Sequence, residues 1–313
     1  MKSKWFATVL VGVASFLAGS QRMRGQQAPA NGVPAHMVVS AEAHKGSELP
    51  AINREDVMVM EGHDRDTVVD WVPATGEHAA MELFVLLDDG ANISLGSQLD
   101  EIKKFILAQP ESTKVGVAYM QDGMARVVQE LTNDHEQAAK ALRLPLGSRG
   151  VNASPYFSVS DLIKRWPVTS ARREVFVASD GIDLYYGSGS MDNPYVDAAV
   201  EDAQKTGTVV YGIYTPGMGH MGHSRWLTNW GQMYLAQLAE QTGGEAYYIG
   251  FEGPAVSFSP YLNEISEHFA HQYLLTFVPK PQKKAGMQKV KIRTEVPKVD
   301  LTAADQVYVP KGK

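Results

Sequence analysis

The feature of this sequence that most restricts its fold is a regular alternation of strand-like and helix-like segments between residues 80 and 279. The run LFVLL at 83–87 is continuously apolar, as expected of a strand that helices cover on both faces. Leu99, Ile102 and Phe105 then recur at helical spacing. Strands that alternate with helices favour parallel pairing through right-handed crossovers. We therefore expect an α/β domain with a doubly wound, mostly parallel sheet.

Local signals divide the rest of this region into elements. Further strands are expected at 114–120, 125–131, 174–179, 208–214, 245–250 and 273–278. Asp122-Gly123 predicts a hairpin, so the strand that follows should run antiparallel at the sheet edge. Asn193 predicts the N-cap of a helix whose first residue is Pro194. Gly243 and Gly244 predict the end of a later helix.

Short β segments flank this region on both sides. Residues 36–79 contain strand-like runs at 37–42, 56–61 and 67–72, and residues 280–313 contain runs at 289–296 and 306–310. Isolated short strands cannot bury their apolar faces alone. We expect both ends of the chain to form one small β-subdomain.

The N-terminus predicts export. Lys2 and Lys4 precede an apolar run over 5–17, and small residues follow, which is typical of a secretory signal peptide over residues 1–20. An uncleaved anchor is the alternative, although the run is shorter than the ~20 residues of a membrane-spanning helix. Residues 21–35 are expected to form a disordered linker. The predicted location is periplasmic or extracellular, with no integral membrane span after cleavage.

Composition restricts the partners. The formal net charge of the chain is -6, and it becomes -8 when Lys2 and Lys4 leave with the signal peptide. Nucleic-acid binding needs a concentrated basic face, so we expect no nucleic-acid partner. The chain has no cysteine, so no disulfide stabilises the exported protein.

Two predicted strands end in carboxylates at one edge of the sheet. The first strand ends at Asp88 and Asp89, and the strand at 174–179 is followed by Asp180. In a doubly wound sheet, ligands bind beyond the carboxyl ends of the strands, where the strand order reverses. Two carboxylates that meet there repel each other unless a cation or a proton separates them. A hard ion such as Mg²⁺ suits oxygen ligands of this kind.

These residues also carry a resemblance to a known family. The segments FVLLDDGAN at 84–92, VASDG at 177–181 and AEQTGGEAYY at 239–248 resemble the von Willebrand factor type A (VWA) domain, which has a Rossmann-like fold. The segment at 49–64 and the C-terminal strands resemble a bacterial subgroup of exported VWA-related proteins. The resemblance implies a binding or adhesion role for the sheet-top loops.

The resemblance also implies a metal-ion-dependent adhesion site in a degenerate form. Asp88 matches the first aspartate of the family's Asp-x-Ser-x-Ser pattern and Asp180 matches its later aspartate, whereas Gly90 and Asn92 replace the two serines. The family's threonine ligand has three candidate replacements, which are Asn152, Ser154 and Ser158. Our candidate metal ligands are Asp88, Asn92, Ser154 and Asp180, with weakly bound Mg²⁺ as the ion and otherwise no cofactor. In the alternative interpretation, these aspartates only cap the next turn or helix.

Three further residues are candidates for contact with a protein partner. Asp89 lies at the same strand end, and Tyr185 and Tyr186 follow Asp180 closely. Tyrosine is favoured at interfaces because it combines apolar area with one polar group. In the alternative interpretation, both tyrosines pack against a neighbouring loop.

We therefore predict an exported, non-catalytic module that binds an unknown protein partner through the sheet-top loops. The sequence has no Gly-x-Ser-x-Gly elbow and no His-Glu-x-x-His pair. Two alternatives are an extracytoplasmic hydrolase that uses metal-bound water near Asp88 and Asp180, and a metal-free scaffolding protein.

Overall fold

The computed structural model describes residues 33–44, 47–91, 93–148, 150, 153–187, 190–216, 224–248, 256–281 and 284–310. The predicted signal peptide lies outside these residues, and so does the predicted linker up to residue 32. Strand β1 begins at Ala35, which is the last residue of the predicted linker. No helix in the described part of the chain is long and apolar enough to cross a membrane.

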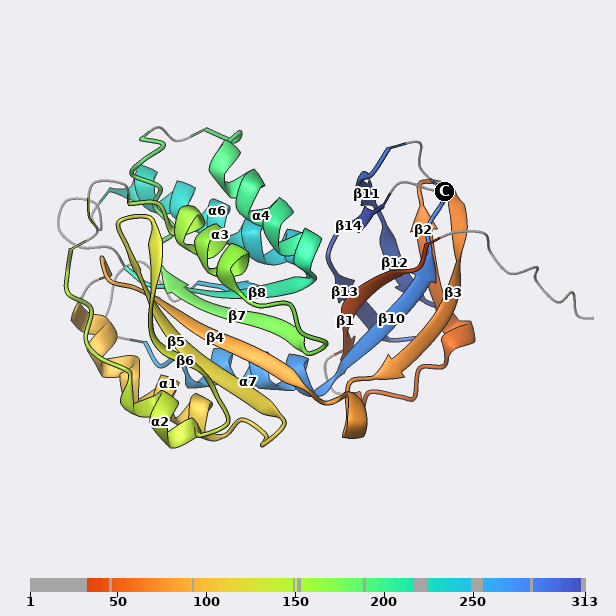
Figure 1. Cartoon of the computed structure of the whole chain (residues 1–313), viewed down its shortest axis with the longest axis horizontal. Coiled ribbons are helices and arrows are strands. Elements are labelled where there is room, and N and C mark those ends of the chain that lie inside the picture. Colours follow the sequence, from red (N-terminus) through yellow and green to blue (C-terminus); the bar gives the residue numbers. More distant parts are fainter. Residues whose placement is uncertain are drawn as a thin grey trace, which may run out of the picture. The chain divides into compact units, whose positions relative to one another are not determined.

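A six-stranded sheet forms the centre of the α/β unit (Figure 1). Its strands in spatial order are β6 (Met124–Thr132), β5 (Thr113–Gln121), β4 (Met81–Asp88), β7 (Arg172–Ser179), β8 (Thr208–Tyr214) and β9 (Ala246–Tyr247). Only β6 runs antiparallel to its neighbour. The doubly wound, mostly parallel sheet is therefore confirmed, and its order reverses between β4 and β7.

Helices cover both faces of this sheet, as Figure 1 shows. One face carries α1 (Leu99–Leu107), α2 (His135–Lys140) and α7 (Ser259–Ala270), and the other carries α3 (Pro155–Arg165), α4 (Pro194–Thr206) and α6 (Arg225–Thr242). Alternate side chains of β4 enter the two cores, with Leu83 and Val85 on one side and Phe84 and Leu86 on the other. Burial on both faces explains why this strand is apolar without interruption.

The predicted hairpin, helix start and helix end are confirmed. The hairpin between β5 and β6 turns at Asp122 and Gly123, which have φ angles of 53° and 74°. The Asn193 side chain accepts a hydrogen bond from the Tyr195 backbone N–H at 3.0 Å at the start of α4. Gly243 ends α6 with a φ angle of 89°.

The chain ends form a second sheet, and all its pairings are antiparallel. Its strands in spatial order are β12 (Lys291–Thr294), β2 (Val57–Glu61), β3 (Asp64–Pro73), β10 (Gln272–Val278), β1 (Ala35–Ala43) and β13 (Val299–Ala303). A separate ribbon joins β11 (Gly286–Lys289) to β14 (Gln306–Val309). Short 3-10 helices occupy Arg54–Asp56, Gly76–His78 and Ile93–Gln98. The second sheet has its own apolar core, so the β-subdomain is larger than the small one we expected.

Two strand predictions need correction. The run at 273–278 was expected to complete the parallel sheet, but β10 lies between β1 and β3 of the antiparallel sheet. Its apolar sequence has the same appearance in either sheet, and only the pairing decides between them. The run at 289–296 was expected to be one strand, but it splits between β11, which pairs with β14, and β12, which pairs with β2.

A buried polar cluster lies where β7 and β8 meet β1 and β10. Glu174 is fully buried. Burial raises the pKa of Glu174 to about 8, although the charge of Arg172 and hydrogen bonding with Gln272 oppose this shift. The Tyr211 hydroxyl reaches Ser40 of β1 at 3.4 Å. The cluster therefore brings a carboxyl group into the interior, where its neutral form is favoured.

This raised pKa predicts a pH dependence of stability. Between the ordinary value of 4.5 and about 8, the folded state keeps the Glu174 proton that the unfolded state releases, so stability falls as pH rises. Glu174→Gln should remove this dependence and raise the free energy of unfolding at pH 8 by at least about 1 kcal/mol. Urea denaturation at pH 5 and pH 8 would measure both effects. Equal pH dependence in the wild type and the variant would contradict the assignment.

Candidate functional site

The ends of β4 and β7 meet at the point where the sheet order reverses. The two strands are adjacent and parallel, with Leu87 opposite Ala178. The Ser179 hydroxyl donates a hydrogen bond to Asp88 Oδ2 at 2.8 Å, and Asp180 follows directly in the chain. The structure thus brings the two aspartates to neighbouring strand ends, where open α/β sheets bind ligands.

A small cavity opens beside Asp88. It has a volume of about 10 Å³, which is about the room that one water molecule needs. Five of the lining residues carry side-chain oxygen atoms, which are Asp88, Gln121, Asp122, Ser154 and Ser158. Ser154 comes from the N-cap of α3, where its hydroxyl accepts a hydrogen bond from the Phe157 backbone N–H at 3.4 Å. Two of the predicted metal ligands, Asp88 and Ser154, therefore share one cavity.

The other two predicted ligands are placed differently. Asp180 is fully buried and does not line this cavity. Its Oδ1 atom accepts a hydrogen bond from the Ile182 backbone N–H at 2.9 Å, which shapes the loop that follows β7. Asn92 lies outside the described residues. The loop that follows β7 thus uses one carboxylate oxygen of Asp180 in the local turn, as the capping interpretation anticipated.

The cavity is a reasonable match for a weakly held hard cation. Asp88 already accepts two hydrogen bonds, from Ser179 and from the Gly90 backbone N–H at 2.7 Å. Each carboxylate oxygen has a second lone pair, so Asp88 retains the capacity to contact an ion. Within this lining, Asp88, Ser154 and Ser158 supply one carboxylate and two hydroxyls, and such oxygen donors fit Mg²⁺ that keeps most of its water molecules. Asp88 and Ser154 are the residues that would hold such an ion.

The position of Asp89 differs from the sequence prediction that it contacts a partner. This residue was a candidate for partner contact, but it is fully buried and forms a bidentate ion pair with Arg143 at 2.6 and 2.8 Å. The Leu146 backbone N–H donates a third hydrogen bond to Asp89 Oδ1 at 3.1 Å. Asp89 therefore holds the 143–147 segment in place, and a partner cannot reach its side chain in this arrangement.

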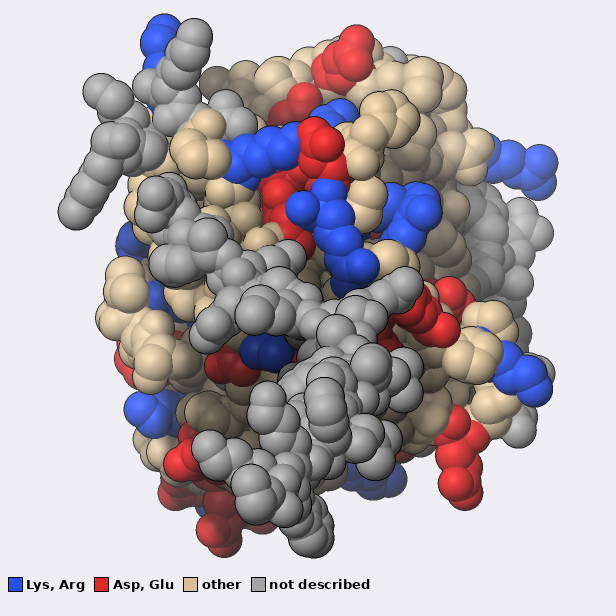
Figure 2. Space-filling view, turned by 90° about the vertical axis from the view of Figure 1, so that its right-hand side faces the viewer, with Lys and Arg blue, Asp and Glu red and all other residues tan. Residues whose placement is uncertain are grey.

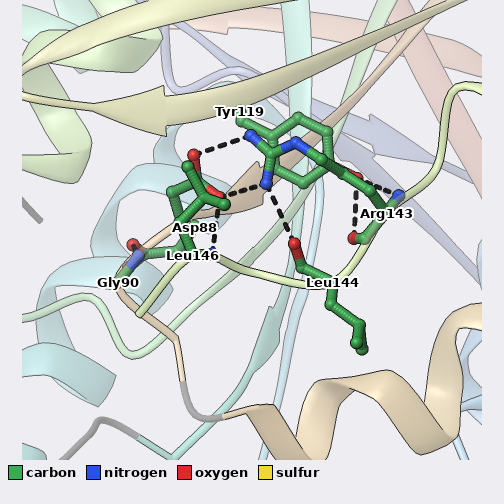
Figure 3. Close-up of polar contacts among 7 residues, drawn as sticks. Asp88, Gly90, Tyr119, Arg143, Leu144 and Leu146 are labelled. Atoms are coloured by element: carbon green, nitrogen blue, oxygen red, sulfur yellow. Dashed lines mark hydrogen bonds and ion pairs between the residues drawn. The ribbon is translucent and has the colours of Figure 1, made fainter. Parts of the chain in front are cut away.

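Arg143 is a residue that no sequence pattern singled out. Its guanidinium lies over the Tyr119 ring at 3.8 Å from the centroid, and its backbone N–H donates to the Tyr119 hydroxyl at 2.6 Å (Figure 3). The hydrogen bonds to Asp89 raise the pKa of Arg143, which keeps the guanidinium charged. No local signal marks this arginine, because both its partners lie far away in the sequence.

The loop between β7 and α4 is held by several polar contacts. The Leu184 backbone N–H donates to the Ala153 carbonyl at 3.0 Å, which fixes this loop beside Ser154. The Asp183 carboxylate accepts from the Tyr186 backbone N–H at 3.0 Å and from the Asn193 side chain at 3.1 Å. These contacts give the loop a defined shape, which lowers the entropic cost of binding.

Four aromatic rings gather on this loop and on the helices beside it. Tyr185 packs against Phe157 at 4.9 Å and against Tyr195 at 5.4 Å, and Tyr186 lies 6.2 Å from Tyr195. Tyr185 is 49% exposed, whereas Tyr186 is half-buried and its hydroxyl donates to the Asp192 carbonyl. We call Phe157, Tyr185, Tyr186 and Tyr195 the aromatic cluster. Tyr185 thus packs against two neighbouring rings and keeps about half of its surface exposed.

Charged residues of both signs alternate on the face that Figure 2 shows, where Lys and Arg side chains lie beside Asp and Glu. Ion pairs also occur among the described residues, such as Lys280 with Asp64 and Lys205 with Glu201. Such a surface differs from the concentrated basic face that nucleic-acid binding needs.

The strand order and the carboxylates at its reversal point define an α/β protein of the doubly wound class. Comparison with solved structures shows what it is similar to. The VWA structure from Catenulispora acidiphila matches at 9% identity and a TM-score of 0.46, over 90% of this chain and 75% of that one. An aerotolerance-related membrane protein from Bacteroides fragilis matches at 15% identity and a TM-score of 0.45, over 61% of this chain and 98% of that one.

A third similar structure is that of three N-terminal domains of the type V pili tip protein from Porphyromonas gingivalis, at 9% identity and a TM-score of 0.41, over 92% of this chain and 68% of that one. No protein-family model and no curated protein matches the sequence. All three TM-scores lie below 0.5, so the strand order of the α/β unit, and not these likenesses, defines its fold as doubly wound.

Proposed function

We propose that this chain is an exported, non-catalytic module that binds a protein partner through the loops at the carboxyl ends of β4 and β7. The observation that carries the proposal is the half-exposed Tyr185, which stands on a fixed loop next to the Asp88 and Ser154 cavity. An aromatic side chain on a shaped loop supplies large contact area at low entropic cost. The neighbouring cavity adds a polar group for specificity.

The non-catalytic part of the proposal rests on the composition of the cavity. Its ionisable lining residues are Asp88 and Asp122, and Asp122 belongs to the hairpin turn. Hydrolysis by metal-bound water also needs a group that accepts or donates a proton at the reacting atom. Broad hydrolase screening with and without Mg²⁺ tests this part, and turnover that Asp88→Asn abolishes would overturn it.

Tyr185→Ala tests the contact surface. If Tyr185 anchors the partner, its truncation should weaken binding by about 2 kcal/mol, or about 30-fold. Tyr308 on β14 is a matched control, since it is 41% exposed and lies away from the sheet top. The measurement is the amount of partner that each variant retains from an envelope fraction. Equal losses in Tyr185→Ala and Tyr308→Ala would contradict the assignment.

The proposal also includes weak binding of Mg²⁺ at the Asp88 cavity, which a separate experiment tests. Mg²⁺ at about ten times its dissociation constant should raise the free energy of unfolding by about 1 kcal/mol, because it binds only the folded state. Asp88→Asn should abolish this gain, and Asp192→Asn in an exposed loop should retain it. If millimolar Mg²⁺ stabilises neither the wild type nor the control, the module binds its partner without metal.

A further inference from the structure

Three metal-ligating side chains meet at the junction of the antiparallel sheet and the α/β unit. They are Glu42 on β1, Glu245 directly before β9 and His268 in the last turn of α7. One donor atom from each lies within 4.8 Å of the other two. These residues come from distant parts of the sequence, so no spacing pattern revealed them, and none belongs to the Asp88 cavity.

Backbone hydrogen bonds hold the segments that carry these three side chains. The Ala41 backbone N–H donates to the His271 carbonyl at 3.0 Å, which ties β1 to the end of α7. The Gly212 backbone N–H donates to the Glu245 carbonyl at 2.9 Å, which ties Glu245 to β8. Glu42 and His268 therefore stand on a strand and a helix, which hold ligands more exactly than loops do, and Glu245 is tied to the neighbouring strand.

The imidazole of His268 points at the two carboxylates. Its Nε2 atom contacts Glu42 Oε1 and lies 3.8 Å from Glu245 Oε2. His268 is only 5% exposed, its Nε2 atom faces the two carboxylates, and its Nδ1 atom has no hydrogen-bond partner among the described residues. Two carboxylates that gather at one imidazole nitrogen repel each other, and a cation among the three groups offsets this repulsion.

The electrostatic environment favours a cation at this point. Glu264 stands one turn before His268 on α7 and adds a third carboxylate to the surroundings. Burial raises the pKa of Glu245, and the charges of Glu264 and Glu42 act in the same direction, whereas His268 opposes them. The Tyr247 hydroxyl donates to Glu245 Oε2 at 3.2 Å, an outer contact of the type that orients metal-binding carboxylates.

We propose that Glu42, Glu245 and His268 bind a divalent transition-metal ion, with Zn²⁺ as the best match. An imidazole with two carboxylates suits Zn²⁺, whereas Mg²⁺ and Ca²⁺ favour oxygen-only ligand sets. The carboxylate side chains of Glu42 and Glu245 are 45% and 46% exposed, so the ion has a path from solvent and a position for water. The bound ion links β1 to α7 and stabilises the junction between the two sheets.

Titration of the untagged, signal-free protein with Co²⁺ tests this site, because Co²⁺ in a four- or five-coordinate protein site gives visible absorption bands that Zn²⁺ then displaces. The expected result is one tight equivalent in the wild type. Glu42→Gln and Glu245→Gln should each weaken binding at least about tenfold. Both side chains are half-exposed, so these variants are expected to fold, which circular dichroism would check.

Two controls separate this site from others. Glu267→Gln changes an exposed carboxylate on the same helix and should leave the Co²⁺ spectrum unchanged. His220→Ala with His223→Ala removes a pair of imidazoles outside the described residues and should also leave it unchanged. The proposal is overturned if the wild type binds no Co²⁺, if the double variant Glu42→Gln/Glu245→Gln binds normally, or if binding is lost only with His220 and His223.

Discussion

Replacing Arg143 with leucine is expected to lower the free energy of unfolding by about 3–5 kcal/mol, the usual effect of leaving one partner of a buried ion pair without its counter-charge. Asp89 is fully buried, and Arg143 supplies two of its three side-chain hydrogen bonds. The variant also loses the contact of the guanidinium with the Tyr119 ring. Urea denaturation of wild type and variant at pH 7 would measure the change.

A surface ion pair provides the control. Lys205 and Glu201 lie at 2.7 Å on α4, with side chains that are 43% and 51% exposed. Lys205→Leu should change stability by only about 0.5 kcal/mol, because solvent screens exposed pairs. If Arg143→Leu costs no more than this control, the Asp89 pair does not hold the 143–147 segment as we describe.

Gly181→Ala is expected to cost about 3 kcal/mol, the sum of a left-handed backbone and an overlap with a neighbouring helix. Gly181 follows Asp180 and has a φ angle of 64°. A Cβ atom there would lie 2.2 Å from the Gly231 carbonyl oxygen of α6. Because backbone cannot move aside as a flexible side chain does, the loop that carries Tyr185 has to shift. The variant should therefore weaken partner binding as well as stability.

Gly207→Ala separates the two contributions. Gly207 has a similar φ angle of 66° at the end of α4, but a Cβ atom at this position would meet nothing within 4 Å. This variant should cost only the backbone contribution of about 1 kcal/mol and leave partner binding intact. Equal stability losses in the two variants would show that the close approach of Gly181 to α6 has no energetic importance.

The sequence predicted the parts of the fold that depend on local chemistry. The uninterrupted apolar run of β4 identified a strand buried on both faces, and its end located Asp88. Asp122-Gly123, Asn193 and Gly243 predicted a hairpin, a helix start and a helix end, because each residue type satisfies a specific backbone requirement.

The features that the sequence could not predict depend on contacts between residues that lie far apart in the chain. Consecutive residues at a strand end point in opposite directions, so of Asp88 and Asp89 only one lines the cavity. Asp89 instead pairs with Arg143, which lies 54 residues away in the sequence. The placement of β10 likewise depends on partners in β1 and β3. The Glu42, Glu245 and His268 cluster exists only because of this pairing.

Site-specific photo-crosslinking in intact cells tests the central claim most directly. A photoreactive phenylalanine analogue at position 185 would probe the sheet top, and the same analogue at position 308 would probe an equally accessible aromatic position elsewhere. We predict a discrete protein adduct from position 185 and none from position 308. No adduct at 185, or the same adduct at both positions, would contradict a binding role for the loops around Tyr185.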